Sequence, residues 1–249
     1  MTDPAPQQEP LLRIESLTKS FGGFVALDNV NVDITKGERF GLIGPNGSGK
    51  TTLVNCISGA LRPNKGRVVF AGDDITTLPP NRRSHRGIAR SFQIPRPFRS
   101  MTVLENLMVA LDFAGNRHLL ETEAHRRDVA MSILTRIGLA ARAGVPTAVL
   151  TQVELRKMEL ARALATGPKL LISDEAMAGL STSEVDEVLD LLLSLGGEDI
   201  AIIMIEHIMQ AVMRFSQRVM CLDAGRIIAL GAPSEVMANA RVQEAYLGT

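Results

Sequence analysis

The chain has 249 residues, and its 27 basic side chains equal its 27 acidic ones in number. This balance gives no overall field that would attract nucleic acid, so we expect no nucleic-acid partner and only a local site for any anion. The most apolar stretch, residues 200–205, is far shorter than the roughly 18 to 20 apolar residues of a membrane-spanning helix, so we expect no span within this sequence.

The N-terminal part of the sequence predicts mainly β-structure. Residues 1–10 contain three prolines and lack the profile of a signal peptide, so we expect a disordered tail followed by one domain over 11–249. Alternating apolar residues predict antiparallel strands at 11–16 and 30–34. Two further strands are expected at 66–70 and 88–92.

The rest of the sequence changes from helical patterning to a regular alternation of strands and helices. Residues 101–164 are typical of helices, and we place a helical subdomain at about 95–165. After it, strands are expected at 169–173, 200–205 and 218–222, with helices at 183–195 and 207–215. Near-continuous apolar strands in βαβ order predict a buried parallel sheet, and therefore an α/β fold.

A glycine-rich segment between an expected strand and an expected helix fits the pattern GxxxxGK[ST]. In this pattern backbone N–H groups turn onto phosphate oxygens, the lysine reaches the β- and γ-phosphates, and the last hydroxyl holds Mg²⁺. A glycine-rich connector that binds nothing is the alternative, but it would place a lysine against the dipole of a helix start. The residues expected to contact ATP are Gly44, Pro45, Asn46, Gly47, Ser48, Gly49, Lys50, Thr51 and Thr52.

Two carboxylates follow the apolar strand at 169–173. Alone, such a pair is more often a strand end that enters solvent. In a chain that also has a phosphate-binding loop, we expect Asp174 to hold Mg²⁺ through water and Glu175 to orient or deprotonate the attacking water. The sequence therefore predicts a P-loop NTPase that uses ATP and Mg²⁺.

This ordered series of motifs resembles the ATP-binding subunits of ABC transporters, from about Leu12 to Leu247. The resemblance implies a RecA-like core with an N-terminal antiparallel β region and an inserted helical subdomain. It also implies that Phe21 stacks on adenine, that Gln93 touches Mg²⁺ and water, and that His207 contacts the γ-phosphate. Without the resemblance, each of these three residues would read as an ordinary core or surface residue.

Three segments are similar to the branched-chain amino acid importer group, and to the larger of its two ATPases. They are residues 21–27, Glu206-His207 with the residues that follow, and the ending 244–248. The implied partners are a second ATPase subunit, as a hetero- or homodimer, two transmembrane permease subunits, and a periplasmic or extracellular substrate-binding protein. Branched-chain amino acids are the implied substrate, while urea, short amides and small organic acids stay open.

The implied location is the cytoplasmic side of the cell membrane, as a peripheral subunit. Cys56 and Cys221 lie far apart in apolar stretches, which suits a reducing cytosol better than a disulfide framework or a metal site. The segment after Gln93, around 95–98, is the expected contact with the permease. A proline-stiffened surface loop is the alternative interpretation of that segment.

The sequence departs from the family at its signature, LSGGQ, which binds the γ-phosphate held by the opposite subunit. The aligned residues are Leu150-Thr151-Gln152-Val153-Glu154. Thr151 keeps a hydroxyl for this contact, but Val153 replaces a glycine, and a β-branched residue does not readily take φ > 0. Glu154 adds a negative charge beside the phosphate that the signature would bind.

From this departure we expect a heterodimer with two unequal ATP sites. Ala176 and Ser181 are smaller departures that affect contact between subunits more than nucleotide binding. A regulatory subunit that binds ATP with little hydrolysis is one alternative, disfavoured by the presence of Glu175 and His207. A soluble ABC ATPase without a transport role is another, disfavoured because the chain has one ATPase module and no long insertion.

Overall fold

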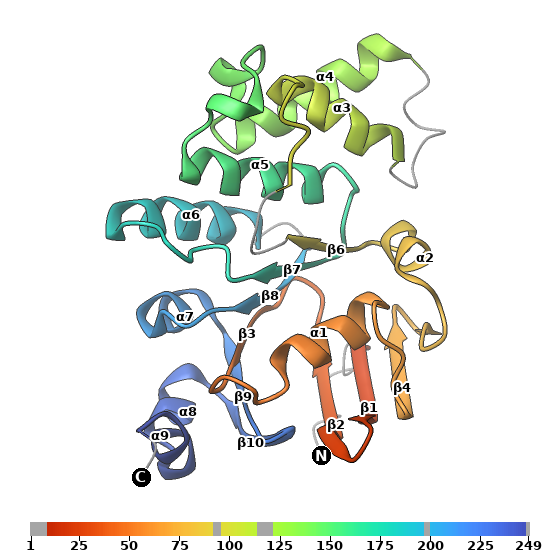
Figure 1. Cartoon of the computed structure of the whole chain (residues 1–249), viewed down its shortest axis with the longest axis vertical. Helices are drawn as coiled ribbons and strands as arrows, with labels where there is room; N and C mark the ends of the chain where they lie inside the picture. Colours follow the sequence, from red (N-terminus) through yellow and green to blue (C-terminus); the bar gives the residue numbers. More distant parts are fainter. Residues whose placement is uncertain (1–8, 92–95, 114–121, 197–199, 248–249) are drawn as a thin grey trace, which may run out of the picture.

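The computed structural model describes residues 9–91, 96–113, 122–196 and 200–247. Gln93, Pro95 and most of the expected tail lie outside these residues. Two sheets and the helices around them make up the described part of the chain (Figure 1). Helices α3, α4 and α5 lie at one end of the molecule, and the antiparallel strands and α8 and α9 lie at the other.

The smaller sheet is antiparallel, as predicted, and has the strand order β2-β1-β4-β5. Along β2 the burial alternates, because successive side chains of a strand point to opposite faces. One face therefore packs into the core while the other stays in contact with solvent. The strands are β1 (Leu12–Phe21), β2 (Phe24–Ile34), β4 (Lys65–Phe70) and β5 (Asp73–Asp74).

The larger sheet has the order β10-β9-β3-β8-β7-β6, and its strands are parallel from β9 to β6. The predicted parallel sheet is confirmed, and β7 and β8 consist almost wholly of buried residues. The strands are β3 (Arg39–Ile43), β6 (Ile88–Ser91), β7 (Leu170–Asp174), β8 (Ala201–Ile205), β9 (Arg218–Asp223) and β10 (Arg226–Gly231).

Helices cover both faces of this sheet. The α-helices are α1 (Lys50–Ser58), α2 (Pro80–His85), α3 (Val103–Phe113), α4 (Glu123–Arg136), α5 (Gln152–Leu164), α6 (Thr182–Leu195), α7 (Met209–Phe215), α8 (Pro233–Ala238) and α9 (Ala240–Leu247). Two 3₁₀ turns, η2 (Ala140–Arg142) and η3 (Thr147–Val149), lie between α4 and α5. None of the described helices is long and apolar enough to cross a membrane.

Alternate residues of the central strands divide the core into two main clusters. Leu171 and Ile202 pack with α3 to α7 on one face of the sheet. Ile172 and Ile203 pack on the other face with α1 and the antiparallel sheet, so α1 lies between the two sheets. This placement holds the start of α1 at the edge where the parallel strands end.

The elements after Asp223 were not expected from the sequence. Strand β10 pairs antiparallel with β9, and α8 and α9 pack on β9 and β10. Val236 and Val242 place these two short helices in a third cluster with Ile43 and Cys221. Each helix has at most eight residues, which is too short for a clear helical pattern in the sequence.

Candidate functional site

The predicted site residues come from the carboxyl ends of three parallel strands. Strand β3 ends at Ile43, directly before Gly44, and β7 ends at Asp174. Strand β8 lies between them and ends at Ile205, two residues before His207. Because parallel strands end at the same edge of a sheet, the fold brings these segments together, as is typical of ligand sites in α/β proteins.

The loop between β3 and α1 has a conformation that needs its glycines. Gly44, Gly47 and Gly49 have φ of 146°, 80° and 108°, which lie in the region that side chains disfavour. A Cβ on Gly44 would lie 2.1 Å from the carbonyl oxygen of Leu222, and one on Gly49 would lie 2.6 Å from that of Ala26. The loop is therefore held against β2 and β9.

The N-terminus of α1 suits an anion. Gly49 is its N-cap, with no side-chain cap and no acidic residue in the first turn. By contrast, α5 and α6 begin with capping boxes closed by Glu154 and Glu184. Free N–H groups and the positive end of the helix dipole at α1 fit phosphate oxygens.

Lys50 folds back onto this loop. Its Nζ donates to the carbonyl oxygens of Gly44 at 2.7 Å and of Pro45 at 3.0 Å. Burial lowers the pKa of Lys50, while the nearby Glu175, Cys221 and Asp174 oppose this shift. The structure thus places the positive charge of Lys50 close to both predicted carboxylates.

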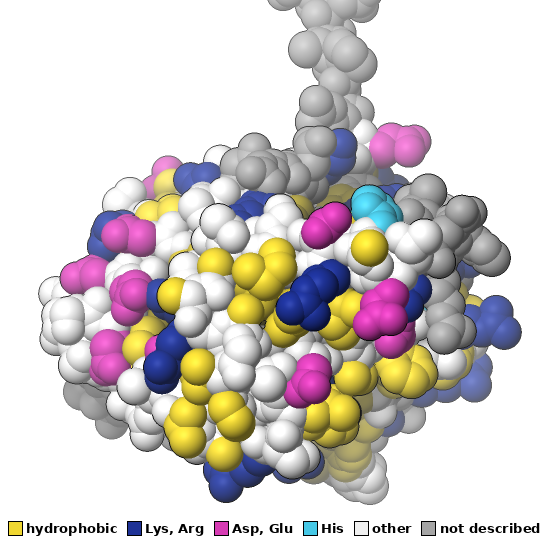
Figure 2. All heavy atoms as spheres, turned by 90° about the horizontal axis from the view of Figure 1, so that it is seen from above, with side chains coloured by type: hydrophobic (Ala, Val, Ile, Leu, Met, Phe, Trp, Pro, Cys, Tyr) yellow, Lys and Arg dark blue, Asp and Glu magenta, His cyan; other side chains and the backbone are white. Residues whose placement is uncertain are grey.

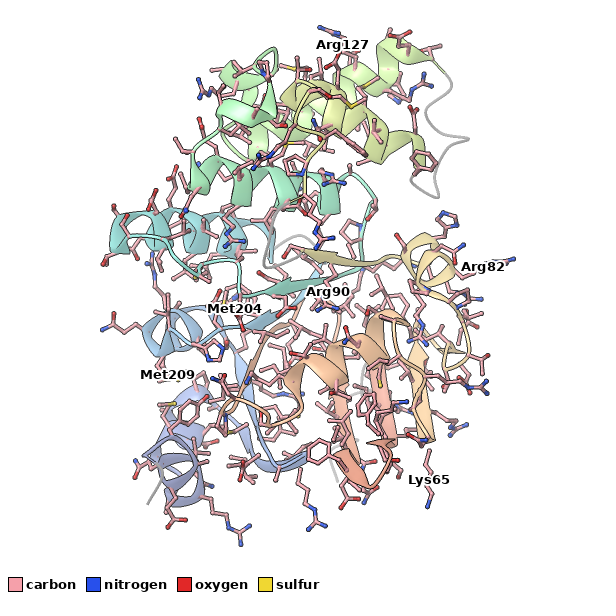
Figure 3. All side chains as sticks on the ribbon, in the orientation of Figure 1. Lys65, Arg82, Arg90, Arg127, Met204 and Met209 are labelled. Atoms are coloured by element: carbon pink, nitrogen blue, oxygen red, sulfur yellow. The ribbon has the colours of Figure 1, made fainter. Side chains whose placement is uncertain are left out.

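Asp174 is held by an arginine that the sequence analysis did not single out. Arg90, at the centre of the molecule in Figure 3, donates from Nη2 to Asp174 Oδ2 at 2.6 Å. Its Nη1 donates to Asn55 Oδ1 of α1 at 2.7 Å. Arg90 therefore joins β6, β7 and α1, and fixes one oxygen of the carboxylate expected to hold Mg²⁺.

Glu175 and His207 lie in contact. His207 Nε2 is 3.1 Å from Glu175 Oε1, and the Glu175 backbone N–H donates to Ile205 O at 2.9 Å. Glu175 has a φ of 49°, a conformation that is strained for a residue other than glycine. Such strain is common in functional residues, and the carboxylate of this residue lies beside the imidazole.

A second, buried carboxylate lies behind this pair. Glu206 is 3% exposed, and its Oε1 accepts from the Met177 backbone N–H at 2.9 Å. Arg156 of α5 donates to the carbonyl oxygen of Ala178, the residue after Met177, at 3.1 Å. The loop after Glu175 is thus held from β8 on one side and from α5 on the other.

The expected adenine platform lies on the hairpin of the smaller sheet. Phe21 ends β1, pairs with Phe24 across the turn, and is 47% exposed. The Lys19 ammonium lies 5.0 Å from the centre of the Phe21 ring. Strand β2 then passes the phosphate loop at Ala26, so an exposed aromatic ring stands on the strand pair that borders this loop.

Thr151 lies on the other face of the larger sheet from α1. It is the exposed N-cap of α5, and its Oγ1 accepts from the Glu154 backbone N–H at 3.3 Å. Residues of α5 pack in the core cluster opposite to that of α1. Thr151 is therefore not brought together with Lys50 within one chain, in keeping with an expected role at a partner's site.

The structure shows how the two departures in the signature segment are accommodated within this chain. Val153 lies in the first turn of α5 and is not among the residues with positive φ, as expected for a β-branched side chain. The Glu154 carboxylate closes the capping box with Thr151 and forms an ion pair with Arg142 at 2.9 Å. Burial raises the pKa of Glu154, but these hydrogen bonds lower it further than burial raises it. Its charge is thus compensated within the chain.

Gln93 lies outside the described residues, but the segment after it is anchored to α5. The Arg96 backbone N–H donates to Glu159 Oε1 at 3.2 Å, and Arg162 Nη1 donates to Arg96 O at 3.0 Å. The guanidinium of Arg162 also lies 5.8 Å from the centre of the Phe98 ring. A displacement of this segment would therefore disturb its contacts with α5.

The carboxylate and hydroxyl at this edge fit Mg²⁺ bound through phosphates. Mg²⁺ is usually held by one or two carboxylates and phosphate oxygens, with water as the remaining ligands. Thr51 and Asp174 supply such a sparse set, and the described residues contain no cluster of three or more His, Cys, Asp or Glu that would form a complete protein cage.

Three residues of the site region were missed by sequence reasoning. Arg90 is a charge inside a short strand, and Glu206 is a carboxylate that follows an apolar run, so each had a visible signal. Tyr246, whose hydroxyl accepts from the Gly44 backbone N–H at 2.7 Å, was noted only as part of the ending 244–248. Its role depends on a contact between residues far apart in the sequence.

Two family descriptions match the sequence. Residues 27–178 match the family described as ABC transporter. Residues 226–249 match a family described as branched-chain amino acid ATP-binding cassette transporter. The first covers the phosphate loop, Asp174 and Glu175, and the second covers β10, α8 and α9.

Named proteins and solved structures are similar over nearly the full length. The high-affinity branched-chain amino acid transport ATP-binding protein LivG of Salmonella typhimurium is 38% identical, over 96% of this chain and 98% of its own. The corresponding protein BraF of Pseudomonas aeruginosa is 34% identical with the same coverage. A crystal structure of the ADP conformation of an ATP-binding cassette has a TM-score of 0.88 at 34% identity, covering 97% of this chain and 100% of that one. A dimeric cassette bound to ADP and Pi has a TM-score of 0.78 at 25% identity, with 89% and 98% covered.

Proposed function

Because this chain belongs to the ABC transporter family of ATP-binding subunits, we propose that it hydrolyses ATP to drive an importer of branched-chain amino acids. The predicted family and its RecA-like α/β fold are confirmed. The observation that carries the proposal is the contact of Glu175 with His207 beside Asp174 and the phosphate loop. Binding alone would need the loop, whereas this contact serves hydrolysis.

In the proposed reaction each side chain has a separate task. Lys50 and the N–H groups at the start of α1 bind the β- and γ-phosphates. Glu175 accepts a proton from the attacking water, and His207 orients the Glu175 carboxylate. Thr51 and Asp174 would hold Mg²⁺, which neutralises charge on the phosphate oxygens. Phe21 binds the base by stacking, a contact that tolerates different bases.

The proposed partners follow from the relatives and from the surface. A second ATPase subunit would pair with this chain so that ATP lies between the two subunits. The signature segment of each subunit would then complete the ATP site of the other. Phe98, Phe113 and Val149 of the helical part are exposed, by 46%, 79% and 62%. Figure 2 views the molecule from the end at which α3 and α4 lie and shows hydrophobic side chains at this surface. We assign this end to two permease subunits at the inner face of the membrane, with a substrate-binding protein on the other side.

The proposed activity is tested by the steady-state ATPase rate with Mg²⁺, measured alone and with the candidate partner ATPase. Replacing Glu175→Gln removes the base, so we expect the rate to fall by about 100-fold or more while ATP binding persists. Glu123→Gln is the matched control, because this exposed carboxylate lies on α4, away from the site. ATP binding without hydrolysis in every mixture would instead support the regulatory subunit.

The substrate is tested separately, because this chain carries no substrate site of its own in the proposal. The complete transporter in vesicles should accumulate labelled leucine in an ATP-dependent manner, and Glu175→Gln should stop uptake. ATPase activity with no leucine uptake would leave the enzyme assignment in place. It would move the substrate to urea, short amides or small organic acids.

A further inference from the structure

Helix α9 contacts the phosphate loop through the hydroxyl of Tyr246. Tyr246 is the only tyrosine of the chain, and its Oη accepts from the Gly44 backbone N–H at 2.7 Å. The two residues are 202 positions apart in the sequence. Nothing in the general mechanism of the phosphate loop requires a contact with the end of the chain.

Gly44 needs such an acceptor because of where it lies. The last paired residues of β3 are Leu42 with Ile205 and Ile43 with Cys221, so Gly44 comes just after the ladder of hydrogen bonds. Gly44 is buried against the carbonyl oxygen of Leu222. A buried backbone N–H without a partner is costly, and the Tyr246 hydroxyl supplies the partner.

Helix α9 is anchored at the same place by apolar contacts. Val242, one turn before Tyr246, belongs to the cluster that contains Ile43 and Cys221. Burial raises the pKa of Tyr246 to about 12, so the phenol is neutral at physiological pH. A neutral hydroxyl therefore meets the N–H group without bringing a negative charge to the phosphate site.

Gly44 also accepts a hydrogen bond from Lys50, the lysine of the phosphate loop. Its N–H donates to Tyr246, and its carbonyl oxygen accepts from Lys50 Nζ at 2.7 Å. The hydroxyl of Tyr246 thus fixes the residue on which the Lys50 ammonium rests. A shift of Gly44 would move both the entrance of the loop and this resting place of the lysine.

We propose that Tyr246 is a positioning residue for ATP binding, which holds Gly44 so that the phosphate loop is preformed. The inference rests on the proposed function, because it concerns the affinity of the same loop for ATP. It makes Tyr246 of α9 a support of the nucleotide site. The hydroxyl acts through Gly44 and does not touch the phosphates.

The test replaces Tyr246→Phe, which removes the hydroxyl and keeps the ring. Loss of one hydrogen bond that preforms the loop should raise the Kd for MgATP about fivefold, measured by calorimetry. The ATPase rate at saturating ATP, with the partner present, should stay within about twofold of the wild type. Glu244→Gln, an exposed change on the same helix, should leave both values unchanged.

A second readout follows the contact without nucleotide. In ¹⁵N-labelled protein the Gly44 amide proton resonance should shift in Tyr246→Phe and not in Glu244→Gln. An unmoved Gly44 resonance, or an unchanged Kd for MgATP in Tyr246→Phe, would overturn the inference. The proposed function would still hold if the wild type binds MgATP. Failure of the wild type to bind MgATP would overturn the proposed function and the inference together.

Discussion

Glu206 is a residue whose charge is costly where it lies. Burial raises its pKa, and the neighbouring Glu175 raises it further, while N–H donors from Met177 and His207 oppose the shift. Because the folded-state pKa of Glu206 lies above the ordinary value of 4.5, the protonated side chain contributes its full stabilisation at pH values below 4.5. The contribution is lost as the pH rises through the raised folded pKa.

We therefore expect Glu206→Gln to gain stability relative to the wild type as the pH rises above 4.5, because the amide keeps an acceptor oxygen for Met177 without the charge. Glu206→Ala removes that acceptor and should lower the free energy of unfolding by about 1 to 3 kcal/mol. Unfolding measured between pH 4 and 8 checks both. A constant difference between glutamine variant and wild type over this range would contradict the assignment of a raised pKa.

At the scale of elements, one buried arginine connects the two helices α1 and α2. Arg83 is 1% exposed, and its Nη1 donates to the carbonyl oxygens of Cys56 and Ile57 at the end of α1, at 2.6 and 2.8 Å. It also donates to the carbonyl oxygens of Thr76 and Leu78, both at 2.9 Å. The guanidinium thus satisfies the end of the helix that begins with the phosphate loop.

Replacing Arg83→Met should destabilise the fold, because it leaves these buried carbonyl groups without their donor. We expect a loss of about 3 kcal/mol, or a fall of roughly 6 to 12 °C in the midpoint of thermal unfolding. Arg82→Met is the matched control, since Arg82 is exposed and projects from α2 at the edge of the molecule (Figure 3). Equal melting of the two variants would show that the guanidinium does not hold α2 on α1.

At the scale of the whole molecule, the fold places the phosphate loop and the signature segment on opposite faces of one sheet. Lys50 begins α1 on one face, and Thr151 begins α5 on the other. We expect a signature segment so placed to serve the ATP of another subunit. The segment with Val153 is partly buried against the core and has no glycine for close approach to a phosphate, so unequal sites are expected in a heterodimer.

In a heterodimer with a partner that has an intact signature, Val153→Gly should raise ATP hydrolysis about tenfold at the site that uses Val153, measured with Glu175→Gln in this chain to silence the other site. The reason is that removal of the side chain lets a backbone N–H of this segment approach the phosphate. One such hydrogen bond to a charged group contributes roughly 1.5 kcal/mol. Val153→Ala is the control, because it removes the branched side chain and keeps the helical preference of the backbone. A rate that does not change in the glycine variant would count against unequal sites.

The sequence by itself determined the sheet class, the phosphate loop and the two carboxylates after β7. Their signals are local, because apolar periodicity and glycine spacing act within a few residues of each other. Phe21, His207 and the signature segment required a resemblance to a family, since one aromatic ring or one histidine has no specific pattern. The sequence did not show that Val153 lies in the first turn of helix α5, because the start of a helix depends on its cap and on packing.

Only the tertiary structure decided the contacts that join distant segments. Arg90 meets Asp174 across two strands, Glu206 reaches the loop after Glu175, and Tyr246 meets Gly44 from the end of the chain. Such partners are chosen by burial, because a polar group that loses water must find a donor or acceptor wherever the fold supplies one. The sequence states which groups are polar, and the packing of the sheet and its helices selects which of them meet.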